Sequence, residues 1–450
     1  MTDMKGRDSG GRVWLVILGM GAFLRLALFA VAATGSPSRL LYLPDSLDYD
    51  LLARRLVSHA RFSRDDKPPF HPEILRTPVY PAVLAAIYAA AGPHPLPGPP
   101  SSGPRDAATH AGAEVVAAAL AGVLLSTAAI VLVRRAAREW LPGSTGRLAA
   151  LLVALDLGAA AYGCFLLTEA LFVVLLLLAL TSLARIRSER TPHDLAAWMG
   201  ADGRHAFTVG VLLGVATLCR PIALGLPVAL ALGRTRRQAV LLLSGAAIVV
   251  APWVVRNGLS TGLWSVSSVG SVNLLHHRAG AIENAKAGRP NDTPDHAPGE
   301  NDPAAVRRMT RQGLDVLARN AGVLAVLTAR AWVRTLGPDE DPILLLLGYP
   351  AEPSPWWLAQ RGGSRQPAGL SWLENALEGA FLLCLYVAAA RAIPAFRDPK
   401  RRPLLLAVAA ALAYFVLVSG PEYYGRFRVP LVPLFALAAE AGIARRAPSP

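Results

Sequence analysis

Long apolar stretches alternate with short, arginine-rich polar segments along most of the chain. Ten of these stretches are apolar enough to enter a bilayer as helices. They cover residues 13–34, 113–133, 148–166, 170–184, 206–219, 222–233, 238–255, 371–390, 403–419 and 429–444. The pattern predicts an all-α, polytopic integral membrane protein, a bundle of about 10–12 helices with large outer loops.

Three further segments are helical by pattern without being clear spans. Residues 79–91 are apolar but too short to cross a bilayer at about 1.5 Å per residue, so we expect a re-entrant or surface helix. Residues 304–336 combine helical periodicity with several arginines, which is typical of a surface helix or of one more short span. Residues 45–60 place leucines along one helical face, which predicts a helix on the membrane surface.

The composition agrees with a membrane protein. Hydrophobic residues make up 53% of the chain and charged residues 17%, whereas soluble domains average about 25% charged. The net charge is +14, and the arginines cluster at the ends of apolar stretches. That placement favours membrane orientation and contact with lipid phosphate over nucleic acid. The three cysteines indicate neither a disulfide framework nor a metal site.

The arginine clusters also predict how the chain crosses the membrane. Cytoplasmic loops are enriched in Lys and Arg, and this rule places both termini inside. We treat residues 1–450 as a single transmembrane domain with two large outer segments, 35–112 and 257–370. A few arginines fall on the outer side, against the rule: Arg76, Arg256, Arg426 and Arg428. Cations on that side predict an anionic ligand there.

Six short motifs lie at the outer ends of the predicted spans. They are Asp45-Ser-Leu-Asp-Tyr49, Arg76-x-Pro-x-Tyr-Pro81, Leu167-Thr-Glu169, Cys219-Arg-Pro221, Ala251-Pro-Trp-x-x-Arg-Asn257 and Arg426-x-Arg-x-Pro430. In this order they resemble bacterial GT-C glycosyltransferases of the dolichyl-phosphate-mannose–protein mannosyltransferase type. That group includes the lipid A aminoarabinose transferases and Rgt-like sugar transferases. The resemblance runs over most of residues 13–444.

The resemblance implies a polyprenyl-phosphate sugar donor and chemistry on the outer side of the membrane. In that family the acidic residue of the first outer loop is taken as the catalytic base, and Asp45 matches it. The acidic residue that opens a later span matches Glu169. From position and charge, we add these residues as candidates for substrate binding: Asp48, Arg76, Tyr80, Arg256, Arg426 and Arg428.

Several candidates have simpler structural explanations. Asp45 lies at the start of a predicted helix, where it would serve as a cap, and Asp48 also suits a helix N-terminus. Glu169 begins an apolar span; a carboxylate there is costly, so function is the default hypothesis. For Arg220 at a hairpin turn, a side chain that reaches the membrane surface is nearly as good an explanation as a functional role.

Metal dependence stays open at this point. Members of the resembled family often carry an acidic residue directly before the basic residue of the Arg/Lys-x-Pro run. In this chain that run begins at Arg76, and the preceding residue is Leu75. Glu73 is the nearest carboxylate, and His276 in the outer segment is a second candidate ligand. We therefore expect no fixed cofactor and leave a divalent cation open.

The resulting hypothesis is a membrane glycosyltransferase of the bacterial cytoplasmic (inner) membrane whose active site faces the periplasm. It would move a sugar, with inversion, from a polyprenyl-phosphate donor to a glycan, lipid or protein acceptor. Its other partners would be membrane lipids, and no nucleic acid is expected. A flippase or transporter of lipid-linked sugars is the main alternative, although no internal repeat of the kind found in many transporters is present.

Overall fold

The computed structural model describes residues 2–42, 44–65, 67–92, 111–186, 200–289, 298–338, 341–349, 368–422 and 425–444. Within these ranges the fold is all helical, as predicted, and contains no strand. The longer helices are α1 (Thr2–Gly35), α2 (Asp45–His59), α3 (Val79–Ala91), α5 (Ala113–Trp140), α8 (Glu169–Ala184), α10 (Ala201–Cys219), α12 (Arg236–Thr261), α15 (Pro303–Arg319), α16 (Ala321–Thr335), α18 (Ala368–Ala390), α19 (Arg402–Ser419) and α20 (Val432–Ile443).

Five of the described helices are long and apolar enough to cross a membrane. Four lie within α1, α5, α12 and α19, and one runs from α18 into the short helix η4 (Ile393–Arg397); α15 with α16 makes a sixth if that bent pair is one span. Large apolar side chains on their surfaces are exposed, such as Phe23 at 74% and Leu417 at 78%. Lipid explains this exposure, because the bilayer is as apolar as the side chains. The prediction of a polytopic membrane protein is confirmed.

The stretch expected as one span at 148–166 is broken. It forms α6 (Arg147–Leu155) and α7 (Leu157–Tyr162), separated at Asp156. The Asp156 carboxylate accepts a hydrogen bond from the Ala159 amide (3.1 Å) and so starts a new helix. The break leaves carbonyls at the end of α6 without helical partners.

Arg25, in the middle of α1, compensates for this break. Its guanidinium donates to the carbonyls of Val153 (2.9 Å) and Ala154 (3.1 Å), and its Nε donates to the Ser126 hydroxyl (2.8 Å). Arg25 is fully buried. A cation inside an apolar span is expected to face the bundle and pair with carbonyls, and Arg25 does both.

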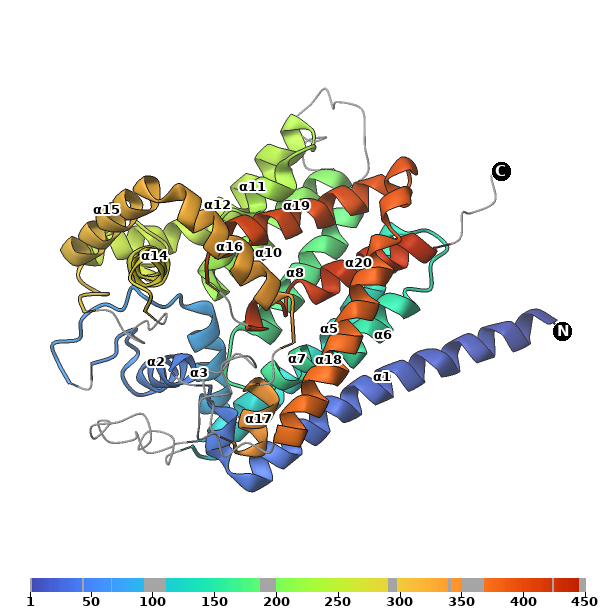
Figure 1. The fold of residues 1–450 in the computed structure, drawn as a ribbon, viewed down its shortest axis with the longest axis horizontal. Helices are drawn as coiled ribbons and strands as arrows, with labels where there is room; N and C mark the ends of the chain where they lie inside the picture. Colours follow the sequence, from blue (N-terminus) through green and yellow to red (C-terminus); the bar gives the residue numbers. More distant parts are fainter. Residues whose placement is uncertain are drawn as a thin grey trace.

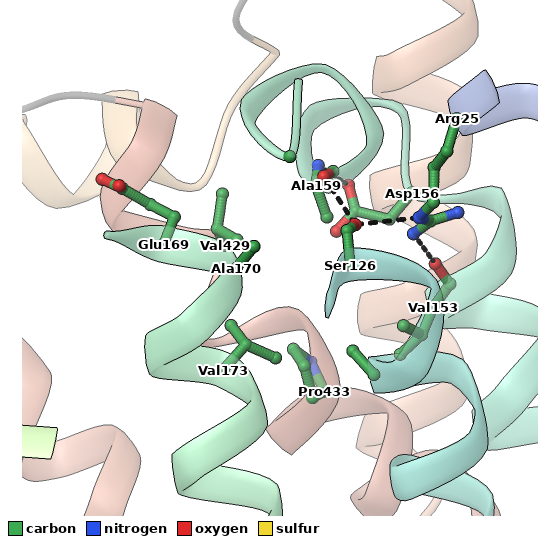
Figure 2. A pocket seen from close by; sticks show the side chains of 12 residues that line it. Arg25, Ser126, Val153, Asp156, Ala159, Glu169, Ala170, Val173, Val429 and Pro433 are labelled. Carbon is green, nitrogen blue, oxygen red and sulfur yellow. Dashed lines mark hydrogen bonds between the residues drawn. The ribbon is translucent and has the colours of Figure 1, made fainter. Parts of the chain in front are cut away.

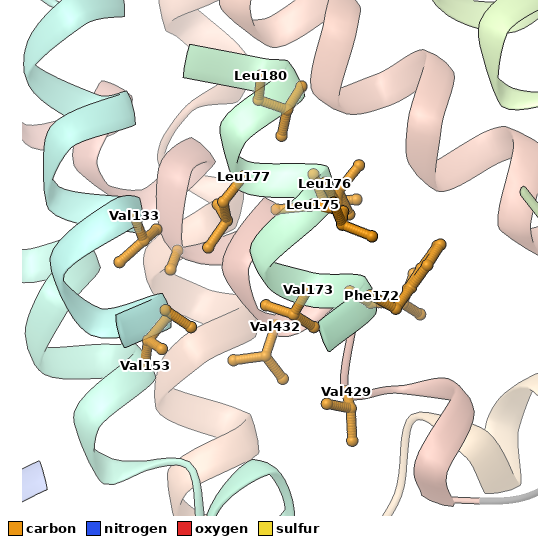
Figure 3. Close-up of a cluster of buried hydrophobic side chains, with 14 of the residues drawn as sticks. Val133, Val153, Phe172, Val173, Leu175, Leu176, Leu177, Leu180, Val429 and Val432 are labelled. Atoms are coloured by element: carbon orange, nitrogen blue, oxygen red, sulfur yellow. The ribbon is translucent and has the colours of Figure 1, made fainter. Parts of the chain in front are cut away.

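The core is formed around α8, which is apolar on all sides. Figure 3 shows its side chains packed against Val133 of α5, Val153 of α6 and Val432 of α20. Beside it, α10 and α12 approach closely at small residues. A Cβ on Gly210 would lie 1.9 Å from the Leu242 carbonyl oxygen, so only glycine allows this packing. Close contact at small residues is the usual way in which membrane helices associate.

The two segments predicted to lie outside pack against each other. In Figure 1, α2 and α3 lie near α14 (Gly280–Lys286) and α15, on the left of the view. Leu75, in the loop between α2 and α3, contacts Val272 and Met309 in a small apolar cluster. Residues 304–336, for which two alternatives were open, form the two helices α15 and α16, bent by 96°.

Candidate active site

Asp45 is the first residue of α2, and its side chain does not cap that helix. Pro44 is the N-cap residue, and no side-chain cap is present. The start of α2 is held by Ser46 instead. The Ser46 hydroxyl accepts from the Tyr42 amide (2.8 Å) and donates to the Leu166 carbonyl (3.0 Å). The Asp45 carboxylate is therefore available for other contacts.

Two arginines from distant parts of the chain hold the Asp45 carboxylate. Arg76 Nη2 donates to Oδ1 (2.5 Å), and Arg426 Nη1 donates to Oδ2. Arg426 belongs to the short helix η5 (Gly425–Phe427). Burial alone would raise the pKa of the Asp45 carboxyl, but the two guanidinium groups hold it well below its usual value. Asp45 is thus ionised at any physiological pH.

Asp48 and two tyrosines complete the surroundings of Arg76. Arg76 Nε donates to Asp48 Oδ2 (2.8 Å), and the guanidinium lies 5.2 Å from the centre of the Tyr49 ring. Tyr49 in turn makes an edge contact with Tyr80 of α3, with ring centres 5.1 Å apart. Burial raises the pKa of the Tyr49 hydroxyl to about 12, so it stays neutral. Arg76 is fixed in place by a carboxylate and an aromatic face.

A second ion pair lies beside the first. Glu169, at the start of α8, pairs with Arg220 at the end of α10 (2.6 Å). The Phe427 ring lies between the two pairs, 5.6 Å from the Arg220 guanidinium carbon and 5.9 Å from that of Arg426. The structure therefore brings Asp45, Asp48, Arg76, Tyr80, Glu169 and Arg426 together at one end of the bundle. We call this set, with Arg220 and Phe427, the charged cluster.

Glu169 also borders a narrow cavity inside the bundle. Figure 2 shows Glu169 and Val429 at one side of this cavity and Arg25 with Asp156 at the other, with Val173 and Pro433 below. The walls are mostly apolar, and the Glu169 side chain is almost fully buried. Of the charged cluster, Glu169 alone lines this cavity.

Two of the arginines predicted to bind substrate lie elsewhere. Arg256 donates to the Glu73 carbonyl (2.7 Å) and the Asn257 side chain (2.9 Å), and its guanidinium lies 4.8 Å from the centre of the Trp253 ring. Arg428 is buried and donates to Glu378 of α18 and to the Gly337 carbonyl. Both arginines tie structural segments together, and neither contacts Asp45.

The candidate metal ligand Glu73 is already occupied by nitrogen donors. Its Oε1 accepts from the amides of Leu75 (2.6 Å) and Arg76 (3.2 Å). Its Oε2 accepts from Asn301 (3.1 Å) and pairs with Arg64 (2.6 Å). In this arrangement Glu73 shapes the loop that presents Arg76.

The second metal candidate, His276, lies in the π-helix η3 (Asn273–Ala279). Within the ranges that the structure describes, no three His, Cys, Asp or Glu side chains gather as a metal site. Sequence reasoning did not identify the role of another carboxylate near η3, Glu422. Its carboxylate accepts from Asn273 (3.2 Å) and from Arg278 (3.2 Å). Burial raises the pKa of Glu422 to about 7, although Arg278 opposes the rise.

Arg64 is a second residue that the sequence did not reveal. It pairs with Glu73 and with Glu300 (2.7 Å), and it lies 3.7 Å from Asp48. It therefore joins the loop before Arg76 to the second outer segment. Its only sequence signal is its place in a polar loop, which did not distinguish it from its neighbours.

No protein-family model matches the sequence, and no curated protein matches it. Among solved structures, the chain is similar to the archaeal oligosaccharyltransferase AglB from Archaeoglobus fulgidus, solved in complex with an inhibitory peptide and a dolichol-phosphate. The two superpose with a TM-score of 0.52 at 16% sequence identity, and the match covers 95% of this chain and 50% of AglB. The apo form of the A. fulgidus oligosaccharyltransferase gives 0.53 at 14% identity, over 96% and 50%. The chain thus spans about half the length of these proteins.

ArnT from Cupriavidus metallidurans bound to undecaprenyl phosphate is also similar, at 15% identity over 96% of this chain and 78% of that one, but its TM-score of 0.39 is too low to bear on the fold. The superpositions on the oligosaccharyltransferase show a shared helical arrangement. The narrower family suggested by the motifs stays a hypothesis.

Proposed function

We propose that the protein is a membrane glycosyltransferase that takes a sugar from a polyprenyl-phosphate donor and passes it to an acceptor on the outer face of a bacterial inner membrane. The observation that carries this proposal is Asp45 held between Arg76 and Arg426. A base for the acceptor and cations for a phosphate are the two groups that this transfer needs. The carboxylate and the two guanidinium groups come from segments up to 381 positions apart in the sequence, and they lie in direct contact.

The reaction would be a single displacement at the anomeric carbon. The acceptor oxygen or nitrogen forms a bond to C1 while the bond from C1 to the phosphate oxygen breaks, and its electrons stay on the phosphate. The acceptor proton passes to Asp45, which must lie within about 2.6–3.2 Å of it. Attack opposite the leaving group inverts the anomeric centre. The oxocarbenium-like transition state is also stabilised by a nearby carboxylate.

The leaving phosphate needs cations more than it needs a proton. Arginine suits this role because its fixed N–H donors match the geometry of phosphate oxygens. Arg76 and Arg426 are our candidates, and Asp48 with Tyr49 would hold Arg76 in position. Preorganised charge of this kind can lower a barrier by several kcal/mol.

The likeness to a protein solved with a dolichol-phosphate adds support for the donor class. Glu169 and Arg220 would border the sugar-binding part of the site. Residues 35–112 and 257–370, whose described parts pack against each other, would form the outer face that receives the acceptor. The whole chain would act as one domain.

The test uses full-length protein purified in detergent with a radiolabelled polyprenyl-phosphate sugar and membrane extract as the acceptor source. We expect Asp45→Asn and Arg76→Ala to abolish transfer to the acceptor. Asp315→Asn and Arg319→Ala serve as matched controls, because this exposed pair lies on α15; these two variants should retain transfer.

Loss of transfer in the two site variants, with normal expression and insertion, supports the proposal. Full transfer by Asp45→Asn would remove Asp45 from the mechanism. Movement of the intact lipid-linked sugar across vesicles, with no new glycosidic bond, would refute the transferase and identify a flippase.

A further inference from the structure

Asp45 and the donor phosphate need the same two guanidinium groups. Arg76 Nη2 lies 2.5 Å from Asp45 Oδ1, and Arg426 donates to Oδ2. The carboxylate therefore bridges the two cations proposed to bind phosphate. A carboxylate in that position is also a weak base, since its pKa is held well below the usual value by both arginines. Brønsted behaviour makes such a group inefficient in proton transfer near neutral pH.

The geometry points to an exchange at this site: the donor phosphate replaces the Asp45 carboxylate on Arg76 and Arg426, and the displaced carboxylate becomes the base that accepts the proton of the acceptor. This inference rests on the proposed function and adds an order of events to it. Donor binding must precede activation of the base, so the site would not activate water before a donor is present.

The two arginines are held by groups other than Asp45, so they can stay in place during the exchange. Arg76 keeps its contacts with Asp48 (2.7 and 2.8 Å) and with the Tyr49 ring. Arg426 lies 5.8 Å from the centre of the Tyr42 ring and 5.9 Å from that of Phe427.

Asp45 is less constrained than the arginines that it contacts. It is the first residue of α2, and its side chain does not cap the helix. In the proposed exchange, a change of its χ1 rotamer would take the carboxylate away from the guanidinium groups while the helix stays in place.

Competition for shared donors has a reciprocal consequence. If the phosphate must displace the Asp45 carboxylate, the carboxylate weakens phosphate binding, and the phosphate weakens the contact of the carboxylate with the arginines by the same free energy. Removing the negative charge of Asp45 must then strengthen phosphate binding. Asn has nearly the same shape as Asp and no charge. Asp45→Asn should therefore bind a lipid phosphate more tightly than the wild type while losing transfer.

The experiment measures binding of undecaprenyl phosphate to full-length protein in detergent micelles by titration. We expect Asp45→Asn to lower the dissociation constant about tenfold, within the range of about 5- to 150-fold that is typical of such coupling. Asp48→Asn is the matched control, because it removes the same charge from the same arginine. In our scheme Asp48 positions Arg76, so this variant should bind equally or more weakly. Undecaprenol, with a neutral head, should bind all variants alike.

The outcomes separate the two proposals. Tighter binding by Asp45→Asn alone supports the exchange. Unchanged or weaker binding by Asp45→Asn overturns the exchange and leaves the transferase proposal standing. Equal tightening by Asp45→Asn and Asp48→Asn also overturns it, because general electrostatics would then explain the effect. A wild type and variants that all fail to bind undecaprenyl phosphate refute both the lipid-phosphate donor and the exchange.

Discussion

The buried pair of Arg428 and Glu378 gives the sharpest prediction about a residue that the sequence assigned to substrate. Only 2% and 3% of the two side chains are exposed, and Arg428 also donates to the carbonyls of Gly337 and Thr335. Removing one partner of a buried pair leaves the other charge without compensation, which costs about 3–5 kcal/mol. We expect Arg428→Met and Glu378→Leu each to lower the free energy of unfolding by that amount.

The double variant separates a structural role from a substrate-binding role. With both charges gone, the remaining cost is two carbonyls without their donor, about 1–3 kcal/mol each at most, and the lost attraction between Arg428 and Asp156. We therefore expect Arg428→Met with Glu378→Leu to be more stable than the sum of the single variants predicts, and to regain sugar transfer. The assay is denaturant titration in detergent micelles, combined with the transfer assay on the same preparations.

Additive losses in the double variant would refute this reasoning, because they would show that the two side chains do not interact. A double variant that folds as well as the wild type but cannot use the donor would point instead to phosphate contact by Arg428. That result would restore the role that the sequence suggested for it.

Three further predictions concern other contacts. Glu73→Gln should raise the KM for the lipid donor several-fold, because the carboxylate that shapes the loop before Arg76 loses its charge. Added Mg²⁺ or Mn²⁺ should not bring the KM back to the wild-type value; if it did, Glu73 would be a metal ligand. Because folding raises the pKa of Glu422 from 4.5 to about 7, the folded state binds this proton more tightly, and the free energy of unfolding should fall as pH rises from about 4.5 to 7. Glu422→Gln should make the unfolding midpoint less dependent on pH over this range, and an unchanged pH dependence would contradict the prediction. Arg25→Leu should cost about 2–4 kcal/mol of unfolding free energy, because Ser126 and two carbonyls lose their donor; an unfolding titration that shows no loss would exclude this role.

The positions of the helices could be predicted because membrane insertion depends on composition and length. Apolar stretches of sufficient length appear as helices in the described ranges. The orientation that the arginine clusters suggest stays a prediction. The break at Asp156 was missed, because residues 148–166 are apolar on both sides of it. Whether a single aspartate caps a new helix depends on the local backbone conformation, and a hydropathy pattern carries no information about that conformation.

The charged cluster could be predicted only in part. The arginine rule selected Arg76 and Arg426 by their predicted side of the membrane, and the family resemblance selected Asp45; the structure places the three side chains in contact. The rule could not separate these two arginines from Arg256 and Arg428, which lie on the same predicted side but bind carbonyls or a buried carboxylate. The direction of a side chain depends on packing between helices, and no local pattern encodes it.

The contact between Asp45 and Arg426 spans 381 positions of the sequence. At about 5–20 residues per second, a ribosome needs on the order of 20–80 seconds to make that interval. During this time the nascent chain can already place Asp45 beside Arg76, but the second guanidinium has not been translated. The charged cluster is therefore assembled in two stages, and the contact between Asp45 and Arg76 can form before the second guanidinium is made.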